Sequence, residues 1–351
     1  MGSSRNWNLF LIASVLLLAF VHNLAAIDSP KSIVFLSPQE CLLQKDPSTS
    51  LASSLKIAVE LGCKSIRIAA GEWQVNETIL LENISSPVSI HGDTIAPVIQ
   101  GRLIVIRRVK NLTLENLTLE GNIEMEQTED ITFRDILFDR GGLFLTGKKC
   151  NQPNECTSFN RGIRVEGCTF ENSIRGIRAE RMENSVIQNN RFKGNPVTCS
   201  PETVGIDLDG SSEDLDRLLE LGHNKGNLIV QNSFEQDSSI GIRVRDSWAN
   251  TIRDNHFKRS YRAMEFHQGA RHNQVLQSYI TYLSQQLTSG ACAAPCAIYV
   301  GPGSVNNIFW NNFFEQNFEL QFLETNRNRT FVIDESGEQN VFRSDFQRIN
   351  R

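Results

Sequence analysis

The chain reads Ile-Gln-Asn-Asn-Arg-Phe at residues 187–192, Ile-Val-Gln-Asn-Ser-Phe at 229–234 and Ile-Arg-Asp-Asn-His-Phe at 252–257. Each copy has an apolar residue, a polar turn that contains Asn, and a second apolar residue five positions after the first. Further copies begin at Leu114, Phe133, Val165, Val275, Ile308 and Val341. The basic step is about 22 residues, and longer steps add an inserted loop. Such a repeat of short strands and Asn turns predicts a solenoid.

A second predicted strand lies between these copies, as in Gly-Ile-Asp-Leu-Asp at 205–209 and Gly-Ile-Arg-Val-Arg at 241–245. Its apolar and polar residues alternate, which is the period of a half-buried strand. We expect the Asn residues at 190, 232, 255 and 311 to form the turns, because Asn tolerates left-handed backbone. The aromatic residues expected to stack inside the coil are Phe170, Phe192, Phe234, Phe257 and Phe313.

An amphipathic helix is expected around residues 51–61, followed by strands at 65–70, 78–81 and 88–92. The order of helix, strand, Gly turn and strand resembles the N-terminal cap of pectin-lyase-like, right-handed parallel β-helix proteins. A cap is needed because the open end of a coil stack exposes core and unpaired strand edges. The Leu-rich repeat signature is absent, and Gly and Asn interrupt every helical window. The resemblance implies an all-β, right-handed parallel β-helix over about residues 31–349, with an N-terminal capping helix.

The resemblance does not supply catalytic residues. The Asn-Thr-Asp, Asp-Asp, Gly-His-Gly and Arg-Ile-Lys elements of polygalacturonases are not matched, and neither is the Asp-Pro-His-Asp of alginate epimerases. A scaffold of this kind carries many chemistries. Any active site must therefore be argued from the residues of this chain.

Composition limits the function. The chain has 351 residues, 40% of them hydrophobic and 21% charged, so it can bury a large core. Its formal net charge of −5 argues against nucleic-acid binding, which favours a basic excess.

The first 26 residues are predicted to be a secretory signal peptide. Arg5 gives a positive start, residues 9–21 are apolar apart from Ser14, and small residues precede Ile27. The alternative is an N-terminal membrane anchor, but the apolar stretch is shorter than the roughly 20 residues that span a bilayer. We expect a secreted or periplasmic monomer without a membrane span, with a cap segment over 27–64 and the β-helix over 65–351.

The cysteines agree with export, since an even number in an exported chain suggests disulfides. The pairs that we expect are Cys41–Cys63, Cys150–Cys156, Cys292–Cys296 and, by remainder, Cys168–Cys199. Zinc is the alternative, but no Cys-x-x-Cys pair or His partner at ligand spacing is present. Sequons at Asn76, Asn83, Asn111, Asn116 and Asn328 make the chain a candidate glycoprotein.

A charged patch is predicted on the outer face of the second strand. If Ile206 and Leu208 point inward, Asp207 and Asp209 point outward, and coils about 4.8 Å apart bring their counterparts together. The candidate catalytic residues are Asp207, Asp209, Glu265 and His267. The candidate substrate-binding residues are Glu180, Arg243, Arg245 and Tyr299.

We expect these residues to line a groove walled by 195–204 and 283–296. Asp209 and His267 are the candidates for proton transfer, Arg245 would hold a substrate carboxylate or oxyanion, and Asp207 and Glu265 would be a second carboxylate pair. Paired carboxylates would suit a glycoside hydrolase, whereas a cation with a base and an acid would suit a lyase or epimerase on uronic acids.

Three alternatives stay open. The patch could be a structural ladder of ion pairs, which stabilises a solvated sheet face without a substrate. Asp207, Asp209 and Glu180 could bind calcium, although no Asp-rich loop accompanies them. No other cofactor is expected. The sequence thus predicts a secreted carbohydrate-active protein that acts on a polysaccharide, either neutral or uronic-acid-containing, or else a non-catalytic glycan-binding or structural surface or matrix protein.

Overall fold

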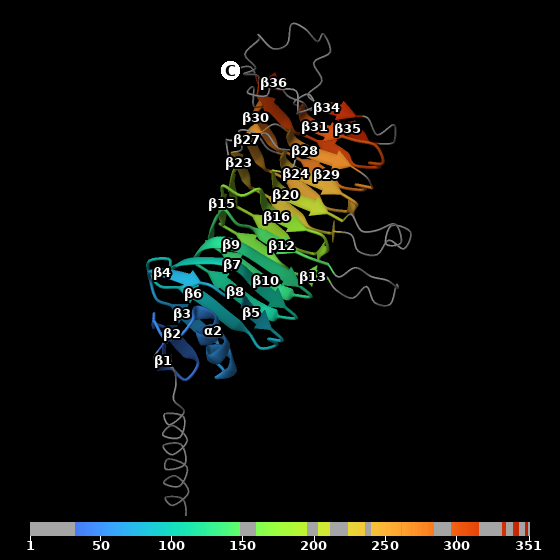
Figure 1. Cartoon of the computed structure of the whole chain (residues 1–351). Coiled ribbons are helices and arrows are strands. Elements are labelled where there is room, and N and C mark those ends of the chain that lie inside the picture. The colour runs from blue at the N-terminus through green and yellow to red at the C-terminus, as the bar shows by residue number, and fades with distance from the viewer. Residues whose placement is uncertain are drawn as a thin grey trace, which may run out of the picture.

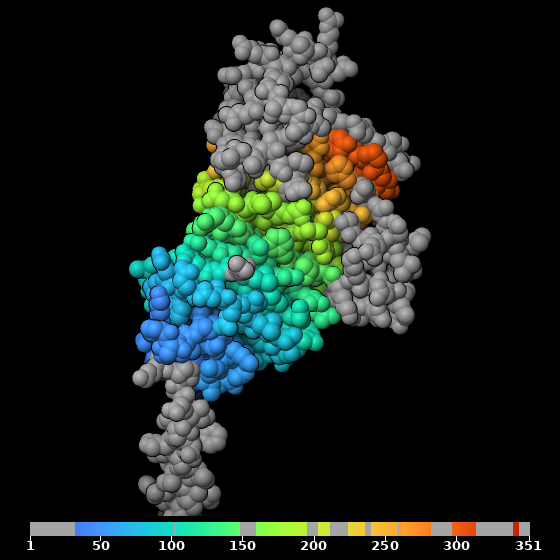
Figure 2. All heavy atoms as spheres, in the orientation of Figure 1, coloured from blue at the N-terminus to red at the C-terminus, as the bar shows by residue number. Residues whose placement is uncertain are grey.

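A computed structural model shows a stack of parallel coils with a cap at its N-terminal end (Figure 1). It describes residues 32–147, 159–194, 203–210, 224–235, 240–260, 262–267, 269–283, 296–315, 332–334, 340–343 and 348–349. Each coil contributes strands to rows that run along the stack, and within a row each strand pairs in parallel with its counterpart one coil away. Figure 2 shows the coils as successive bands of colour from the cap upward. The predicted all-β, right-handed parallel β-helix with an N-terminal helix is confirmed.

The first row carries the apolar residue that opens each repeat. It consists of β2 (Glu40–Leu43), β3 (Ser65–Ile68), β6 (Val88–Gly92), β8 (Lys110–Glu115), β10 (Glu129–Arg134), β14 (Arg164–Glu166), β18 (Val186–Gln188), β22 (Leu228–Val230), β26 (Thr251–Arg253), β29 (Gln274–Leu276), β32 (Ile308–Trp310) and β35 (Val341–Arg343). Short strands beside it are β13 (Asn160–Arg161), β17 (Met182–Glu183), β21 (Asn224–Lys225) and β25 (Ser247–Trp248).

The second row carries the apolar residue that closes each repeat. It consists of β4 (Glu72–Val75), the first parts of β7 (Val98–Arg107) and β9 (Thr118–Glu126), β11 (Leu137–Asp139), β15 (Thr169–Glu171), β19 (Arg191–Lys193), β23 (Ser233–Glu235), β27 (His256–Ser260), β30 (Tyr279–Leu283), β33 (Phe313–Glu315) and β36 (Arg348–Ile349).

The third row carries the candidate site. It consists of β5 (Ile79–Glu82), the second parts of β7 and β9, β12 (Leu143–Leu145), β16 (Arg175–Ala179), β20 (Val204–Asp209), β24 (Ile240–Arg245), β28 (Arg262–His267), β31 (Cys296–Val300) and β34 (Val332–Asp334). In Figure 1 its strands from β12 to β31 lie one above the next.

Aromatic stacking fills the interior beneath the second row. The rings of Phe138, Phe170, Phe192, Phe234 and Phe257 stack with centroids 4.7–4.8 Å apart and planes within 7° of parallel. Aromatic pairs contribute about 0.5–1.5 kcal/mol each beyond burial. The ladder that the sequence predicts is therefore confirmed for four of its five Phe residues, namely Phe170, Phe192, Phe234 and Phe257.

The prediction that Phe313 is the fifth residue of the buried ladder is wrong. Its ring stacks on Tyr279, which is 46% exposed, whereas Phe309 is buried. The last copies of the repeat are shifted by one residue, since Ile308 and Val341 are 36% and 41% exposed. The copy of the repeat is thus Phe-Trp-Asn-Asn-Phe-Phe at residues 309–314, since Phe309 pairs with Val275 and Phe314 with Ile280. The two adjacent Phe residues made the register ambiguous.

Buried Asn side chains form two ladders at the corners of the coil. Asn190, Asn232 and Asn255 bond side chain to side chain at 3.0 Å. A second ladder, bonded at 2.9–3.1 Å, joins Asn227, Asn250, Asn273, Asn307 and Asn340. The prediction that Asn190, Asn232 and Asn255 are left-handed turn residues is wrong, because positive φ angles occur one residue earlier, at Asn189, Gln231 and Asp254. At Asn311 the prediction is confirmed, with φ of 54°.

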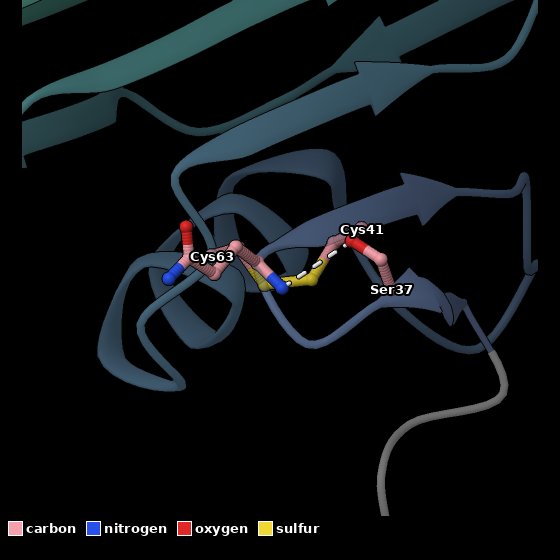
Figure 3. The surroundings of a disulfide bond; sticks show 4 residues. Ser37, Cys41 and Cys63 are labelled. Atoms are coloured by element: carbon pink, nitrogen blue, oxygen red, sulfur yellow. Dashed lines mark hydrogen bonds between the residues drawn. A yellow bond between two sulfur atoms is a disulfide. The ribbon is translucent and has the colours of Figure 1, made fainter.

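The N-terminal cap combines a helix with a disulfide. The helix α2 (Leu51–Glu60) begins after Ser50, whose hydroxyl accepts a hydrogen bond from the Ser53 amide at 3.1 Å. Its buried face covers the first coils, and the antiparallel pair β1 (Ile33–Ser37) and β2 precedes it. The predicted Cys41–Cys63 disulfide is confirmed, with a Cα–Cα distance of 6.0 Å (Figure 3).

The predicted Cys168–Cys199 pair is wrong, because Cys168 is a free, fully buried thiol. Burial raises the pKa of this thiol to about 12. Cys150, Cys156, Cys199 and Cys292, and the side chain of Cys296, lie outside the described residues, so the two local pairs stay predictions.

The predicted signal peptide also lies outside the described residues, and glycosylation and the monomeric state stay predictions. Within the described part of the chain, no helix has the length and apolarity that crossing a membrane requires.

Candidate functional site

Glycines fix how the strands of the third row approach the core. A Cβ on Gly176, Gly205 or Gly241 would lie within 2.8 Å of the rings of Phe192, Phe234 and Phe257 respectively. Any side chain at these positions would displace the aromatic ladder. The second residue of each of these strands is therefore a Gly packed against a Phe ring, and the alternation of inward and outward side chains follows it.

The outward residues of the third row meet across the coils in two columns. One column runs Arg178, Asp207, Arg243, Glu265 and Tyr299 in register. The other column runs Asp209, Arg245 and His267. Glu180 extends this column by one coil, because it directly follows Ala179, which pairs with Leu208. We call these nine residues the outer charged row. All eight sequence-predicted site residues belong to it, and Ile206 and Leu208 lie in the core as expected.

Four of the nine residues of the outer charged row are buried, although they face away from the core. Asp207, Asp209, Arg243 and Glu265 are 0–7% exposed. The half-exposed members are Arg178, Glu180, Arg245, His267 and Tyr299. The predicted groove walls at 195–204 and 283–296 lie mostly outside the described residues, so the groove itself stays a prediction.

Two aspartates are held among arginines. Asp209 accepts a hydrogen bond from Arg245 at 2.7 Å and another from Arg178 at 3.4 Å. The Oδ2 atom of Asp207 lies 3.7–3.9 Å from Arg243, Arg245 and Arg175, and neither of its buried oxygens has a hydrogen bond. Asp207 is thus surrounded by positive charge but not hydrogen-bonded.

Glu265 forms the centre of a second cluster. Its Oε1 accepts a hydrogen bond from Arg262, and its Oε2 lies 3.3 Å from Arg243 Nε and 3.4 Å from His267 Nε2. The His267 ring lies 5.0 Å from the Tyr299 ring, and the Arg262 guanidinium lies 4.4 Å from the centre of the same ring. Four side chains from β28 and β31 therefore orient one another.

The two buried carboxyls have opposite pKa shifts. Burial raises the pKa of Asp207, against the lowering effect of Arg243 and Arg245. Burial also acts to raise the pKa of Glu265, but the hydrogen bond with His267 and the charge of Arg262 outweigh it, and the pKa is lowered. Neighbouring carboxyls with pKa values shifted apart can serve as acid and anion in one site.

Sequence reasoning missed Arg175 and Arg262. Strict alternation places both inside, because each is in register with the apolar residues Val204 and Ile240. Val204 and Ile240 are buried but lie outside the core cluster, so this column also faces outward. The sequence feature that could have revealed both arginines is the small residue that follows each of them, Gly176 or Ala263, because a small residue marks where the alternation is interrupted.

Calcium binding at Glu180, Asp207 and Asp209 stays a hypothesis. Within the described ranges, no group of three His, Cys, Asp or Glu side chains could hold a metal ion. The Arg243 guanidinium lies 3.7 Å from Asp207 and the Arg245 guanidinium 2.7 Å from Asp209, and both would repel a cation there.

The sequence matches the family described as periplasmic copper-binding protein (NosD) over residues 76–347, which is more than half of the chain. The chain belongs to the NosD family. This family description confirms the prediction of an exported protein, extracellular or periplasmic. Comparison with curated proteins finds no significant match.

Solved structures similar to this NosD-family chain are parallel β-helix proteins. The catalytic domain of a GH87 α-1,3-glucanase, in complex with nigerose, has a TM-score of 0.54 at 13% identity, over 80% of this chain and 54% of the glucanase chain. The chain thus spans about half the length of that enzyme domain. The A-module of the Azotobacter vinelandii mannuronan C-5 epimerase AlgE4 has a TM-score of 0.50 at 14% identity, over 85% and 93% of the two chains. These similarities confirm the pectin-lyase-like fold.

The described residues do not fit the copper site that the NosD family description implies. Copper is held by Cys, Met and His side chains. Met125, Met182 and Met264 are buried in the core, and Cys168 is a buried thiol whose pKa is raised to about 12. The described His residues belong to no group of three ligands.

Proposed function

We propose that this protein is an exported carbohydrate-active protein that binds an anionic polysaccharide along the outer charged row. The observation that carries the proposal is the distribution of accessible charge. Arg175, Arg178 and Arg245 are 22–32% exposed, whereas Asp207, Asp209 and Glu265 are 0–7% exposed. A ligand that lies on this face therefore meets mainly guanidinium groups, which bind carboxylates in a bidentate manner.

The reaction that this arrangement supports best is proton transfer on a uronic acid, as in a lyase or an epimerase. Arg245 would neutralise the sugar carboxylate, which acidifies the neighbouring C–H bond. His267, which is half-exposed and oriented by Glu265, would exchange a proton with that carbon. Asp209 would hold Arg245 through their 2.7 Å hydrogen bond.

Hydrolysis receives less support from the same geometry. A glycoside hydrolase needs two carboxyl groups on opposite sides of the scissile bond. Of the carboxylates in the outer charged row, Asp207, Asp209 and Glu265 are buried among arginines, and Glu180 alone is substantially exposed, at 35%. The likeness to the epimerase module is one of fold, and it makes mannuronan a sensible first substrate to test.

The test is a panel of mannuronan, polygalacturonan and α-1,3-glucan, with products followed by proton NMR, by absorbance of unsaturated uronates and by reducing ends. We expect turnover of a polyuronate, lost in Arg245→Ala and His267→Ala. Arg253→Ala and His256→Ala are matched controls, because these residues lie on the exposed faces of other strands and should keep full activity. Equal losses in the controls would contradict the proposal.

A second candidate is glycan binding without catalysis. The observation that favours it is that each carboxylate of the outer charged row is ion-paired with an arginine of the third row. Paired groups need no substrate to be satisfied. Retention of the protein on a polyuronate gel, abolished by Arg245→Ala but without any product, would select this candidate.

A further inference from the structure

The outward column of the third row continues toward the N-terminus beyond Arg178. Phe144 on β12 is in register with Arg178, and Glu124 on β9 is in register with Phe144. Val105 and Leu80 follow in the next two coils. Adjacent coils are about 4.8 Å apart, so these side chains adjoin the outer charged row without a gap.

This upstream stretch has a different character. Leu143 and Leu145 lie in the core, so Phe144 between them faces outward, and its side chain is half-buried. Leu80 is 48% exposed. The row therefore changes from buried charges at one end to an accessible aromatic and aliphatic surface at the other.

Glu124 has no ion pair or hydrogen bond among the described residues. Its neighbour on the same strand, Glu126, is paired with Arg107 at 2.9 Å. The carboxylates of the outer charged row are paired as well. Glu124 is thus a half-buried acceptor that the protein leaves available, one coil from an aromatic ring.

We propose that Phe144 is the platform of a sugar subsite, on which a neutral face of a pyranose packs while Glu124 and Arg178 bond its hydroxyl groups. This inference rests on the proposed function and adds a neutral sugar unit, next to the anionic units, to the ligand. A pyranose has apolar C–H faces and a polar rim, and Phe144 offers an apolar surface with an acceptor on one side and a donor on the other.

The pattern fits a sugar better than a protein segment. A peptide helix that docks in a groove needs a continuous apolar stripe. Here Glu124 lies between Val105 and Phe144 in the column, so its carboxylate interrupts the apolar residues. The upstream surface also lies in line with the exposed guanidinium groups, so one extended chain would contact both ends of the row.

The test measures binding of mannuronan, polygalacturonan and α-1,3-glucan oligosaccharides of increasing length by calorimetry. We expect Phe144→Ala to weaken binding of the longer oligosaccharides about tenfold and to leave the shortest bound oligosaccharide unaffected, because the latter reaches only the charged end. Glu124→Gln should weaken the same longer ligands by a smaller factor. Trp310→Ala is the matched control, since this exposed aromatic residue lies on the first row, and its affinity should equal the wild type.

The outcomes separate the two proposals. If Phe144→Ala binds every oligosaccharide as tightly as the wild type while Arg245→Ala does not bind, the sugar subsite is refuted and the proposed function stands. Loss of binding at all lengths in Phe144→Ala, with an unchanged melting temperature, would also refute a separate subsite. If the wild type binds none of these glycans, both proposals fail.

Discussion

The outer charged row and a second set of charges on the neighbouring row follow the same pattern but differ in burial. On the second row, Glu171, Lys193, Glu235 and Lys258 alternate in sign from coil to coil; we call them the exposed ladder. Lys193 and Glu171 are 37% and 31% exposed, whereas Asp207 and Glu265 are 0% and 5% exposed.

The difference in burial decides whether a contribution to stability is enough to explain each set of charges. An exposed ion pair stabilises a protein by about 0–1 kcal/mol and costs little to maintain. A buried pair loses the hydration of both charges, and apolar residues of similar size often give equal or greater stability. The exposed ladder is therefore sufficiently explained by stability, whereas stability alone does not explain the outer charged row, for which we propose a ligand.

The largest expected effect is on the stability of the row itself. Glu265→Gln removes the charge that Arg243 and Arg262 share, and leaves both buried guanidinium groups poorly compensated. We expect it to lower the free energy of unfolding by about 3 kcal/mol. The matched change Glu235→Gln in the exposed ladder should cost less than about 1 kcal/mol. Urea unfolding at neutral pH measures both, and equal costs would remove the distinction between the two sets.

The next effect is a pH dependence that belongs to Asp207. Because burial raises its pKa in the folded protein, its proton stabilises the fold below the unfolded pKa of about 3.9, and this contribution is lost as the pH rises through the folded pKa. Asp207→Asn cannot lose a proton. Its stability relative to the wild type should therefore increase between about pH 4 and neutrality.

Glu265 gives the opposite sign, because its pKa is lowered in the folded protein. Its contribution is present above the unfolded pKa of about 4.3 and is lost as the pH falls through the folded value. The deficit of Glu265→Gln should thus shrink in acid. Thermal unfolding from pH 3 to 8 tests both variants, and parallel curves for wild type and variants would show that neither carboxyl is shifted.

The smallest expected effect is the response to salt. A double-mutant cycle on Glu171 and Lys193 should give a coupling below about 1 kcal/mol that disappears in 1 M NaCl, where the Debye length is about 3 Å. The equivalent cycle on Arg243 and Glu265 should keep most of its coupling, because water and salt do not reach these side chains. A salt-sensitive coupling at Arg243 and Glu265 would place the row in the same class as the exposed ladder.

The fold could be predicted because the same pattern of apolar and polar residues recurs in successive coils. The Ile at 187, 229 and 252 and the Phe five residues later recur in the same local context, and all are buried as expected. Where two Phe residues stand together, at 313 and 314, the pattern fits two registers and the chosen one is wrong. The Asn residues were misassigned for a similar reason, because Asn suits both a left-handed turn and a buried ladder.

The candidate site could be predicted only in part. Alternation along β20 and β24 correctly brings Asp207, Asp209, Arg243 and Arg245 together. It could not place Arg175 and Arg262, because the strand departs from strict alternation beside Gly176 and Ala263. Burial of outward charges could not be predicted either, since it depends on how residues distant in sequence pack over a face.

The sign pattern of the outer charged row has a consequence for changes in chain length. Excising residues 228–250, one coil between Asn227 and Asn250, would let the Asn ladder close again, because the coil is a complete unit. It would also set Asp207 beside Glu265, since Arg243 now separates them. Excising the two coils that carry Asp207 and Arg243 would instead set Arg178 beside Glu265, so that opposite charges stay neighbours. The alternation of sign therefore links the charge balance of the row to the number of coils between Arg178 and Glu265, and loss of these two coils together should be tolerated better than loss of one.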